Sequence, residues 1–162
     1  MYEQLTYDMG QVMQVEKRHP GNYGAPGVKR APKRKRTPED MARQNMRNRV
    51  KRVQRLILAN FRVGGWHLIL TYKKHLRPDT LDDGKGYVRK FLGKMRKAYQ
   101  KAGYPFKYIC VTEKGKRGAC HHHLIIEDIA NADLNTKEMV MKFWKCGRMT
   151  FLPLYAEGEF ED

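Results

Sequence analysis

The chain of 162 residues lacks the features that mark membrane, secreted and disulfide-rich proteins. It has no long uncharged apolar run that could span a bilayer, and its first residues do not form a secretory signal. Its three cysteines, Cys110, Cys120 and Cys146, are an odd number without CxxC spacing, which argues against a disulfide framework. It contains no internal repeat. These absences predict a cytoplasmic protein with reduced thiols.

Acidic residues are few relative to basic ones, and this imbalance predicts the kind of partner. Lysine and arginine total 33 against 17 aspartate and glutamate residues, which gives a formal net charge of +16. A domain this basic is expected to bind a polyanion, and nucleic acid is the first candidate. An anionic membrane surface is the competing partner, but the missing apolar span leads us to expect no membrane association.

The first 36 residues show no apolar periodicity and are expected to form a flexible basic arm. They are rich in proline and glycine and end in the sequence KRAPKRKR. A solvated linker is the alternative interpretation. The cations of the arm are candidates for contacts with DNA phosphates: Lys29, Arg30, Lys33, Arg34, Lys35 and Arg36.

Hydrophobic periodicity predicts one folded domain over residues 37–162, beginning with a helix over about residues 37–60. Strands are expected at residues 66–72, 106–113, 119–126 and 149–152, and helices at 81–102 and 135–145. The apolar stripe expected to face inward from the first helix consists of Met46, Val50, Val53 and Ile57. This order predicts an α+β fold, with a mainly antiparallel central sheet, helices on one face and the other face open.

A histidine cluster opens the strand expected at residues 119–126. Side chains alternate along a strand, so His121 and His123 lie on one face, about 7 Å apart, and His122 lies on the other. If this strand forms a hairpin with residues 106–113, Glu113 lies beside the two histidines. Two imidazoles and one carboxylate with open positions suit Mg²⁺ or Mn²⁺.

The opposite face of the same hairpin offers an alternative metal site. Cys120 and His122, with Cys110 on the neighbouring strand, could make a smaller zinc cluster. Such residues also pack well in a core. A zinc-stabilised interaction domain is therefore one of the function classes that the residues leave open.

An ordered set of segments resembles the HUH endonuclease superfamily, in which two histidines flank one residue, here His121-His122-His123. More closely, the chain resembles the rolling-circle replication initiator (Rep) proteins of phages, plasmids and integrative elements. The matching segments are LILTY at 68–72, FKYICVTE at 106–113, Glu-x-Gly at 113–115 and WKCG at 144–147. The resemblance covers about residues 60–155.

The resemblance implies a metal-dependent DNA nickase and strand transferase on an HUH platform, a ferredoxin-like split βαβ fold. In that family a tyrosine attacks a phosphodiester of single-stranded origin DNA, which leaves a 5′-phosphotyrosine and a 3′-hydroxyl. The implied metal ligands are His121, His123 and Glu113, and the metal is Mg²⁺ or Mn²⁺. The family's tyrosine lies on a helix downstream of the histidines. Only Tyr155 follows them here, in a strand-like or loop-like segment, so the domain is expected to be truncated before that helix.

The remaining site predictions concern DNA. Tyr72, with Tyr108 or Trp66 as alternatives, is expected to stack on unpaired bases. Further backbone contacts are expected from Arg47, Lys51, Lys116 and Arg117. The expected partners are single-stranded or origin DNA and the host replication machinery. A non-catalytic single-stranded nucleic-acid-binding module and a mobilisation relaxase remain as alternatives.

Overall fold

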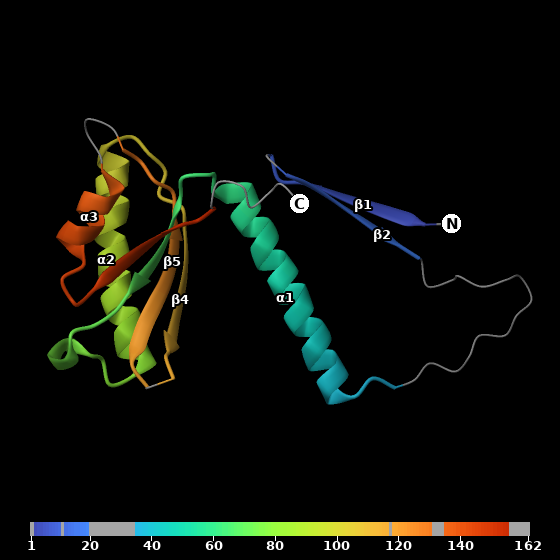
Figure 1. Ribbon diagram of the computed structural model, residues 1–162, viewed down its shortest axis with the longest axis horizontal. Coiled ribbons are helices and arrows are strands. Elements are labelled where there is room, and N and C mark those ends of the chain that lie inside the picture. Colours follow the sequence, from blue (N-terminus) through green and yellow to red (C-terminus); the bar gives the residue numbers. More distant parts are fainter. Residues whose placement is uncertain (1, 11, 20–34, 117, 131–134, 156–162) are drawn as a thin grey trace, which may run out of the picture. The chain divides into compact units, whose positions relative to one another are not determined.

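The computed structural model describes residues 2–10, 12–19, 35–116, 118–130 and 135–155, which belong to two compact units (Figure 1). Unit 1 covers Met1–Asn60 and unit 2 covers Phe61–Asp162. The boundary falls at the end of the first helix and not at residue 36, where the sequence analysis begins the folded domain. The first helix therefore groups with the N-terminal segment.

Unit 1 begins with a β-hairpin, where the sequence analysis expects a flexible arm. β1 (Glu3–Asp8) pairs antiparallel with β2 (Met13–Arg18). The turn is shaped by Gly10, whose φ of +82° favours glycine and whose amide donates to Asp8 Oδ1 at 2.9 Å. The prediction of an arm is wrong for residues 3–18, because the alternating side chains of this hairpin are mostly polar and resemble a solvated segment. The arm cations Lys29, Arg30, Lys33 and Arg34 lie outside the described residues.

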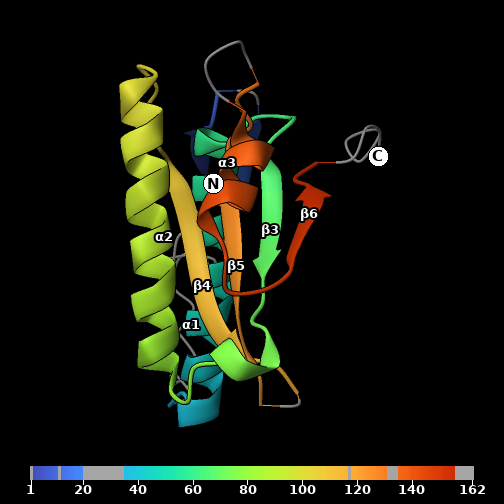
Figure 2. The same cartoon turned by 90° about the vertical axis from the view of Figure 1, so that its left-hand side faces the viewer.

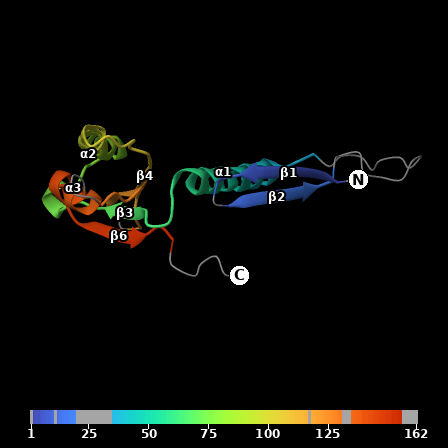
Figure 3. The ribbon, with the colours of Figure 1, turned by 90° about the horizontal axis from the view of Figure 1, so that it is seen from above.

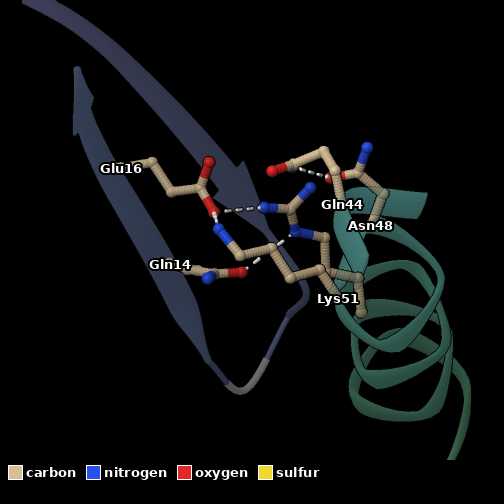
Figure 4. A network of polar contacts seen from close by, with 6 residues as sticks. Gln14, Glu16, Gln44, Asn48 and Lys51 are labelled. Carbon is tan, nitrogen blue, oxygen red and sulfur yellow. Dashed lines mark hydrogen bonds and ion pairs between the residues drawn. The ribbon is translucent and has the colours of Figure 1, made fainter. Parts of the chain in front are cut away.

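The hairpin and helix α1 (Pro38–Asn60) of unit 1 (Figure 3) are held together by polar contacts. The Arg55 guanidinium lies over the Tyr7 ring, 3.4 Å from its centroid, and bonds Glu16 Oε1 at 2.8 Å. Lys51 Nζ reaches the same carboxylate oxygen at 2.7 Å (Figure 4). Glu16 therefore neutralises two cations of the helix, and these cations in turn lower the pKa of Glu16, chiefly through the hydrogen bond from Lys51.

The predicted apolar stripe of α1 does not form a core. No residue of this helix is buried, and Met46, Val50 and Val53 are 61%, 44% and 44% exposed, while Ile57 is half-buried. The predicted helix is confirmed, but a two-stranded hairpin offers too little apolar surface to cover the stripe.

Unit 2 is a four-stranded antiparallel sheet in the order β4-β5-β3-β6, with helices on one face (Figure 2). Its strands are β3 (Trp66–Leu70), β4 (Tyr108–Lys114), β5 (Cys120–Ile126) and β6 (Met149–Pro153). Its helices are the short 3₁₀ turn η1 (Lys74–Leu76), α2 (Leu81–Lys101) and α3 (Thr136–Phe143). The predicted α+β class and element order of this unit are confirmed. None of the described helices has the length and apolar character needed to cross a membrane.

The core lies between the sheet and α2 with α3. The predicted inner face of α2, formed by Val88, Phe91, Leu92, Met95 and Tyr99, is buried. The sheet contributes alternate residues of β3 and β5, and α3 contributes Val140. α2 begins with a capping box, in which Thr80 Oγ1 accepts from the Asp83 amide and the Asp83 carboxylate accepts from the Thr80 amide.

The segment between α3 and β6 packs tightly against the end of β3. Trp144 is 2% exposed, and its Nε1 donates to the Thr71 carbonyl at 3.1 Å. Gly147 passes so close to the Thr71–Tyr72 backbone that a Cβ there would overlap the Thr71 carbonyl and lie 2.6 Å from Tyr72 Cα. The tryptophan and glycine of this segment therefore fix the position of residues 71 and 72.

We expect Gly147→Ala to lower the free energy of unfolding by about 1–3 kcal/mol, because the added methyl meets backbone that cannot rotate away. The matched control is Gly93→Ala in α2, where a Cβ meets nothing within 4 Å. That change is expected to stabilise unit 2 by about 0.5–1 kcal/mol. Urea unfolding followed by tryptophan fluorescence measures both, and equal effects of the two variants would contradict the close approach.

Candidate functional site

The β4–β5 hairpin brings the predicted carboxylate and histidines together. Glu113 pairs with His121 across the two strands, as the sequence analysis expects. The turn is closed by Gly115, whose amide donates to the Ala119 carbonyl at 2.9 Å. Gly118, at a φ of +74°, donates to Gly115. Tight closure leaves no slack in the register, so the carboxylate stands next to the first histidine.

The side chains of Glu113, His121 and His123, here named the ligand cluster, converge on the open face of the sheet. His121 Nε2 lies 3.0 Å and His123 Nε2 lies 3.2 Å from Glu113 Oε1. One ligand atom from each residue lies within 4.8 Å of the other two, and within the described residues this is the one group of three such side chains. The two imidazole rings are 5.0 Å apart between centroids, inclined by 72°.

The ligand cluster has the dimensions of a cation site. Ligand atoms about 2.1 Å from an ion and at right angles to each other are about 3 Å apart. The two histidine–glutamate separations, 3.0 and 3.2 Å, match this spacing. Glu113 is half exposed, so further positions around an ion would be open to water or substrate. The three residues can therefore hold a divalent metal ion while leaving room for a further ligand.

Both histidines of the ligand cluster are held from behind through the nitrogen that faces away from Glu113. His121 Nδ1 lies 3.3 Å from the Ala119 carbonyl oxygen. His123 Nδ1 lies 3.0 Å from Nε2 of His67, a residue of β3. Burial and the neighbouring His123 lower the pKa of His67. Sequence analysis missed His67, because only the pairing of β3 with β5 reveals that it lies diagonally beside His123.

His122 points to the opposite face and is fully buried. Its Nε2 lies 2.7 Å from the Tyr72 hydroxyl, and its Nδ1 lies 2.8 Å from Thr112 Oγ1. Burial, with a smaller contribution from the two neighbouring histidines, lowers the pKa of His122 to about 4. Both ring nitrogens are engaged, so the alternative zinc cluster with Cys110 and Cys120 does not form among the described residues. Burial raises the pKa of the Cys110 thiol to about 11.

Two cavities lie beside predicted DNA-binding cations. A cavity of about 360 Å³ next to His121 is lined by Lys116 and by Arg77, which the sequence analysis missed. In unit 1, a hollow of about 330 Å³ along α1 is lined by Arg36, Arg43 and Arg47. Both are flanked by guanidinium or ammonium groups of the kind that bind phosphate.

The other predicted DNA contacts differ in accessibility. Lys35 is exposed, whereas Lys51 is paired with Glu16. Tyr72 is 8% exposed, its ring packed against Trp144 and its hydroxyl bonded to His122, so it presents no free ring face for stacking. Arg117 lies outside the described residues.

The two alternative stacking residues have partners of their own. Tyr108 is 36% exposed, with the Arg96 guanidinium 6.0 Å from its ring centroid. Trp66 is half-buried and packs edge to face on Phe151. Of the three predicted aromatic residues, Tyr108 is therefore the most accessible.

Tyr155 lies toward the other end of the sheet from the ligand cluster. The amide of Leu154 donates to the Gly65 carbonyl at 2.9 Å, whereas His123 pairs with Ile69, four residues further along the chain. At about 3.4 Å per residue, four residues of strand correspond to about 14 Å. Tyr155 is half-buried, and burial raises the pKa of its hydroxyl.

Comparison with known proteins places unit 2 in a protein family. The model of the family described as Replication-associated protein ORF2 matches residues 66–159, which is more than half of the chain. The match begins with β3 and includes the whole ligand cluster. No curated protein and no solved structure matches significantly.

Removal of either histidine of the ligand cluster should weaken metal binding. We expect His121→Ala or His123→Ala to lower the affinity for Mn²⁺ at least about 100-fold, because two remaining ligands hold an ion poorly. His75→Ala, at an exposed histidine of η1, is the control and should bind like the wild type. Isothermal titration calorimetry gives the affinities. Unchanged binding in a His121→Ala/His123→Ala double variant would remove the basis for the site.

His122 should make the metal-free protein sensitive to acid. Its pKa is near 6.5 in the unfolded chain and about 4 in the folded protein, so between these values only the unfolded state takes up the proton. The free energy of unfolding should therefore fall as the pH drops from about 6.5 to about 4, by up to about 1.4 kcal/mol per pH unit for this residue. Below that range the contribution is constant.

His122→Gln tests this dependence by urea unfolding in the presence of a chelator. The variant is expected to be less stable at neutral pH but to lose less stability on acidification. His75→Gln, at an exposed position, should leave the slope unchanged. An equal slope in His122→Gln and the wild type would show that another group causes the acid sensitivity.

Proposed function

Since the chain belongs to the replication-associated protein ORF2 family, we propose that it is a rolling-circle replication initiator that nicks single-stranded origin DNA. The observation that carries the proposal is the ligand cluster on the open face of the sheet, inside the region that the family model matches. The nick would be made by a tyrosine hydroxyl, as the resemblance of the sequence segments to Rep proteins implies. The finer steps below are part of this proposal.

The ligand cluster would hold Mg²⁺ or Mn²⁺, which supplies positive charge to the scissile phosphate when bound. Glu113 contributes the anionic ligand, and the two histidines present neutral Nε2 atoms next to it. Lys116 and Arg77 line the cavity beside His121, where they would hold the neighbouring phosphates of the strand. These residues orient the phosphodiester for attack.

The reaction would exchange one phosphodiester for another. The tyrosine oxygen forms a bond to phosphorus, the bond from phosphorus to the 3′ oxygen breaks, and the 3′ oxygen leaves with a proton as a hydroxyl. Strand transfer is the reverse step, in which a 3′-hydroxyl attacks the phosphotyrosine. No net energy source is needed, because the bond energy is kept in the covalent intermediate. A mobilisation relaxase would use the same chemistry.

The open face of the sheet also suits contact with unpaired bases. Beside the ligand cluster it carries apolar side chains that are not covered, with Val111 51% exposed and Leu152 41% exposed. Bases of a single strand can lie against such a surface while basic residues hold the phosphates. In unit 1, Lys35 and the hollow lined by Arg36 and Arg47 would add contacts to the DNA backbone.

A non-catalytic single-stranded nucleic-acid-binding module is the second candidate. It is favoured by one observation: of the described strand residues on the face that carries the ligand cluster, none is a tyrosine. In this alternative the basic residues bind the strand, and the metal is not required for affinity. The two candidates predict different products with the same DNA.

The test uses 3′-labelled single-stranded oligonucleotides of random sequence with Mn²⁺. We expect a covalent protein–DNA adduct that survives denaturing electrophoresis, is absent with a chelator, and is lost in His121→Ala/His123→Ala but kept in His75→Ala. Peptide mass spectrometry of the adduct identifies the tyrosine, and Tyr155→Phe shows whether that residue supplies it. Binding without any adduct, at the same affinity in the double variant, would establish the binding module instead.

A further inference from the structure

A fourth histidine, His67, contacts the ligand cluster without belonging to it. Its Nε2 lies 3.0 Å from Nδ1 of His123, and the two rings are 5.2 Å apart between centroids and inclined by only 27°. Residue 67 stands on β3 and residue 123 on β5, where His123 pairs with Ile69. The contact therefore runs diagonally across two strands and ties the ligand to the neighbouring strand.

The chemistry of a neutral imidazole makes this contact consequential. The ring carries one proton, and a metal ion can take only the nitrogen that lacks it. For His123 to offer Nε2 beside Glu113, the proton must be on Nδ1, which then donates to the Nε2 of His67. In the opposite arrangement the His123 Nε2 would carry the proton, and it would donate to Glu113 instead of binding an ion.

We propose that His67 is a positioning residue that accepts a hydrogen bond from His123 Nδ1 and thereby keeps His123 Nε2 free and directed at the cation site. The proposal rests on the metal-dependent function proposed above. His67 is not a fourth ligand, because its Nε2 faces the rear nitrogen of His123 and the group of ligand atoms consists of Glu113, His121 and His123. Such rear partners of ligating histidines set both the tautomer and the ring orientation.

The two ligating histidines differ in how they are held, and this difference makes the proposal testable. The rear partner of His121 is the backbone carbonyl of Ala119, which no substitution removes. The rear partner of His123 is a side chain, which can be exchanged. His67→Phe keeps a flat ring of similar size but has no acceptor. His67→Gln has a carbonyl oxygen that can accept the hydrogen bond again.

The first readout is the tautomer of His123, measured on the metal-free protein by nitrogen-15 NMR of the imidazole rings. We expect the wild type and His67→Gln to carry the His123 proton on Nδ1. In His67→Phe the proton is expected to move to Nε2. An unaltered tautomer in His67→Phe, or a proton on Nε2 in the wild type, would overturn the proposal. The exposed-site variant His75→Phe is the control for an added ring.

The second readout is the affinity for Mn²⁺. His67→Phe is expected to bind Mn²⁺ about 10-fold to 100-fold more weakly than the wild type, and His67→Gln should recover most of the loss. A purely structural role of His67 would affect both variants according to their stability and would leave the tautomer unchanged. If the wild type showed the expected tautomer but bound no Mn²⁺, the hydrogen bond would be supported while the cation site of the proposed function would fail.

Discussion

The buried histidine between the two ligands is the constraint on which the site depends. His122 makes hydrogen bonds with Tyr72 and Thr112 on the helix-covered side of the sheet, where an unpaired polar group would be costly. A shift of β5 by one residue would break both bonds and place a ligand in the core. Because strand side chains alternate, anchoring His122 inside forces both of its neighbours outward. One residue without any expected chemistry thus fixes the geometry of the residues that have it.

Segments far apart in the sequence meet around this anchor. The indole of Trp144 holds the Thr71 carbonyl, Gly147 allows the chain to pass against the same backbone, and the adjacent Tyr72 reaches His122. The tryptophan–glycine segment and the strand with the sequence LILTY therefore act on the ligand cluster through the core and not by touching an ion. On the outer face, the rear contacts of the two ligating histidines complete the support.

The charge of the chain is less freely available than its total suggests. In unit 1, Glu16 pairs with both Lys51 and Arg55, and Arg55 also covers the ring of Tyr7 (Figure 4). These cations hold a hairpin against a helix and contribute less to attraction of DNA than an unpaired residue would. Arg36 and Arg47 line a hollow together, and no acidic partner within the described part of the chain forms an ion pair with them. Net charge predicts a polyanionic partner, whereas pairing decides which cations are left to meet it.

The sequence by itself determined the local structure of unit 2 and the identity of the ligand cluster. Periodicities of helix and strand placed α2, α3 and the four strands, and alternation with a tight loop was enough to bring Glu113 to His121 and His123. Only the tertiary structure decided what depends on contacts between distant segments. These are the pairing of β3 with β5 that brings His67 behind His123, the burial of Tyr72, the hairpin of residues 3–18 and the boundary after Asn60. Local patterns fix which way a side chain faces along its own strand, but its neighbours are set by register and packing, which no single segment encodes.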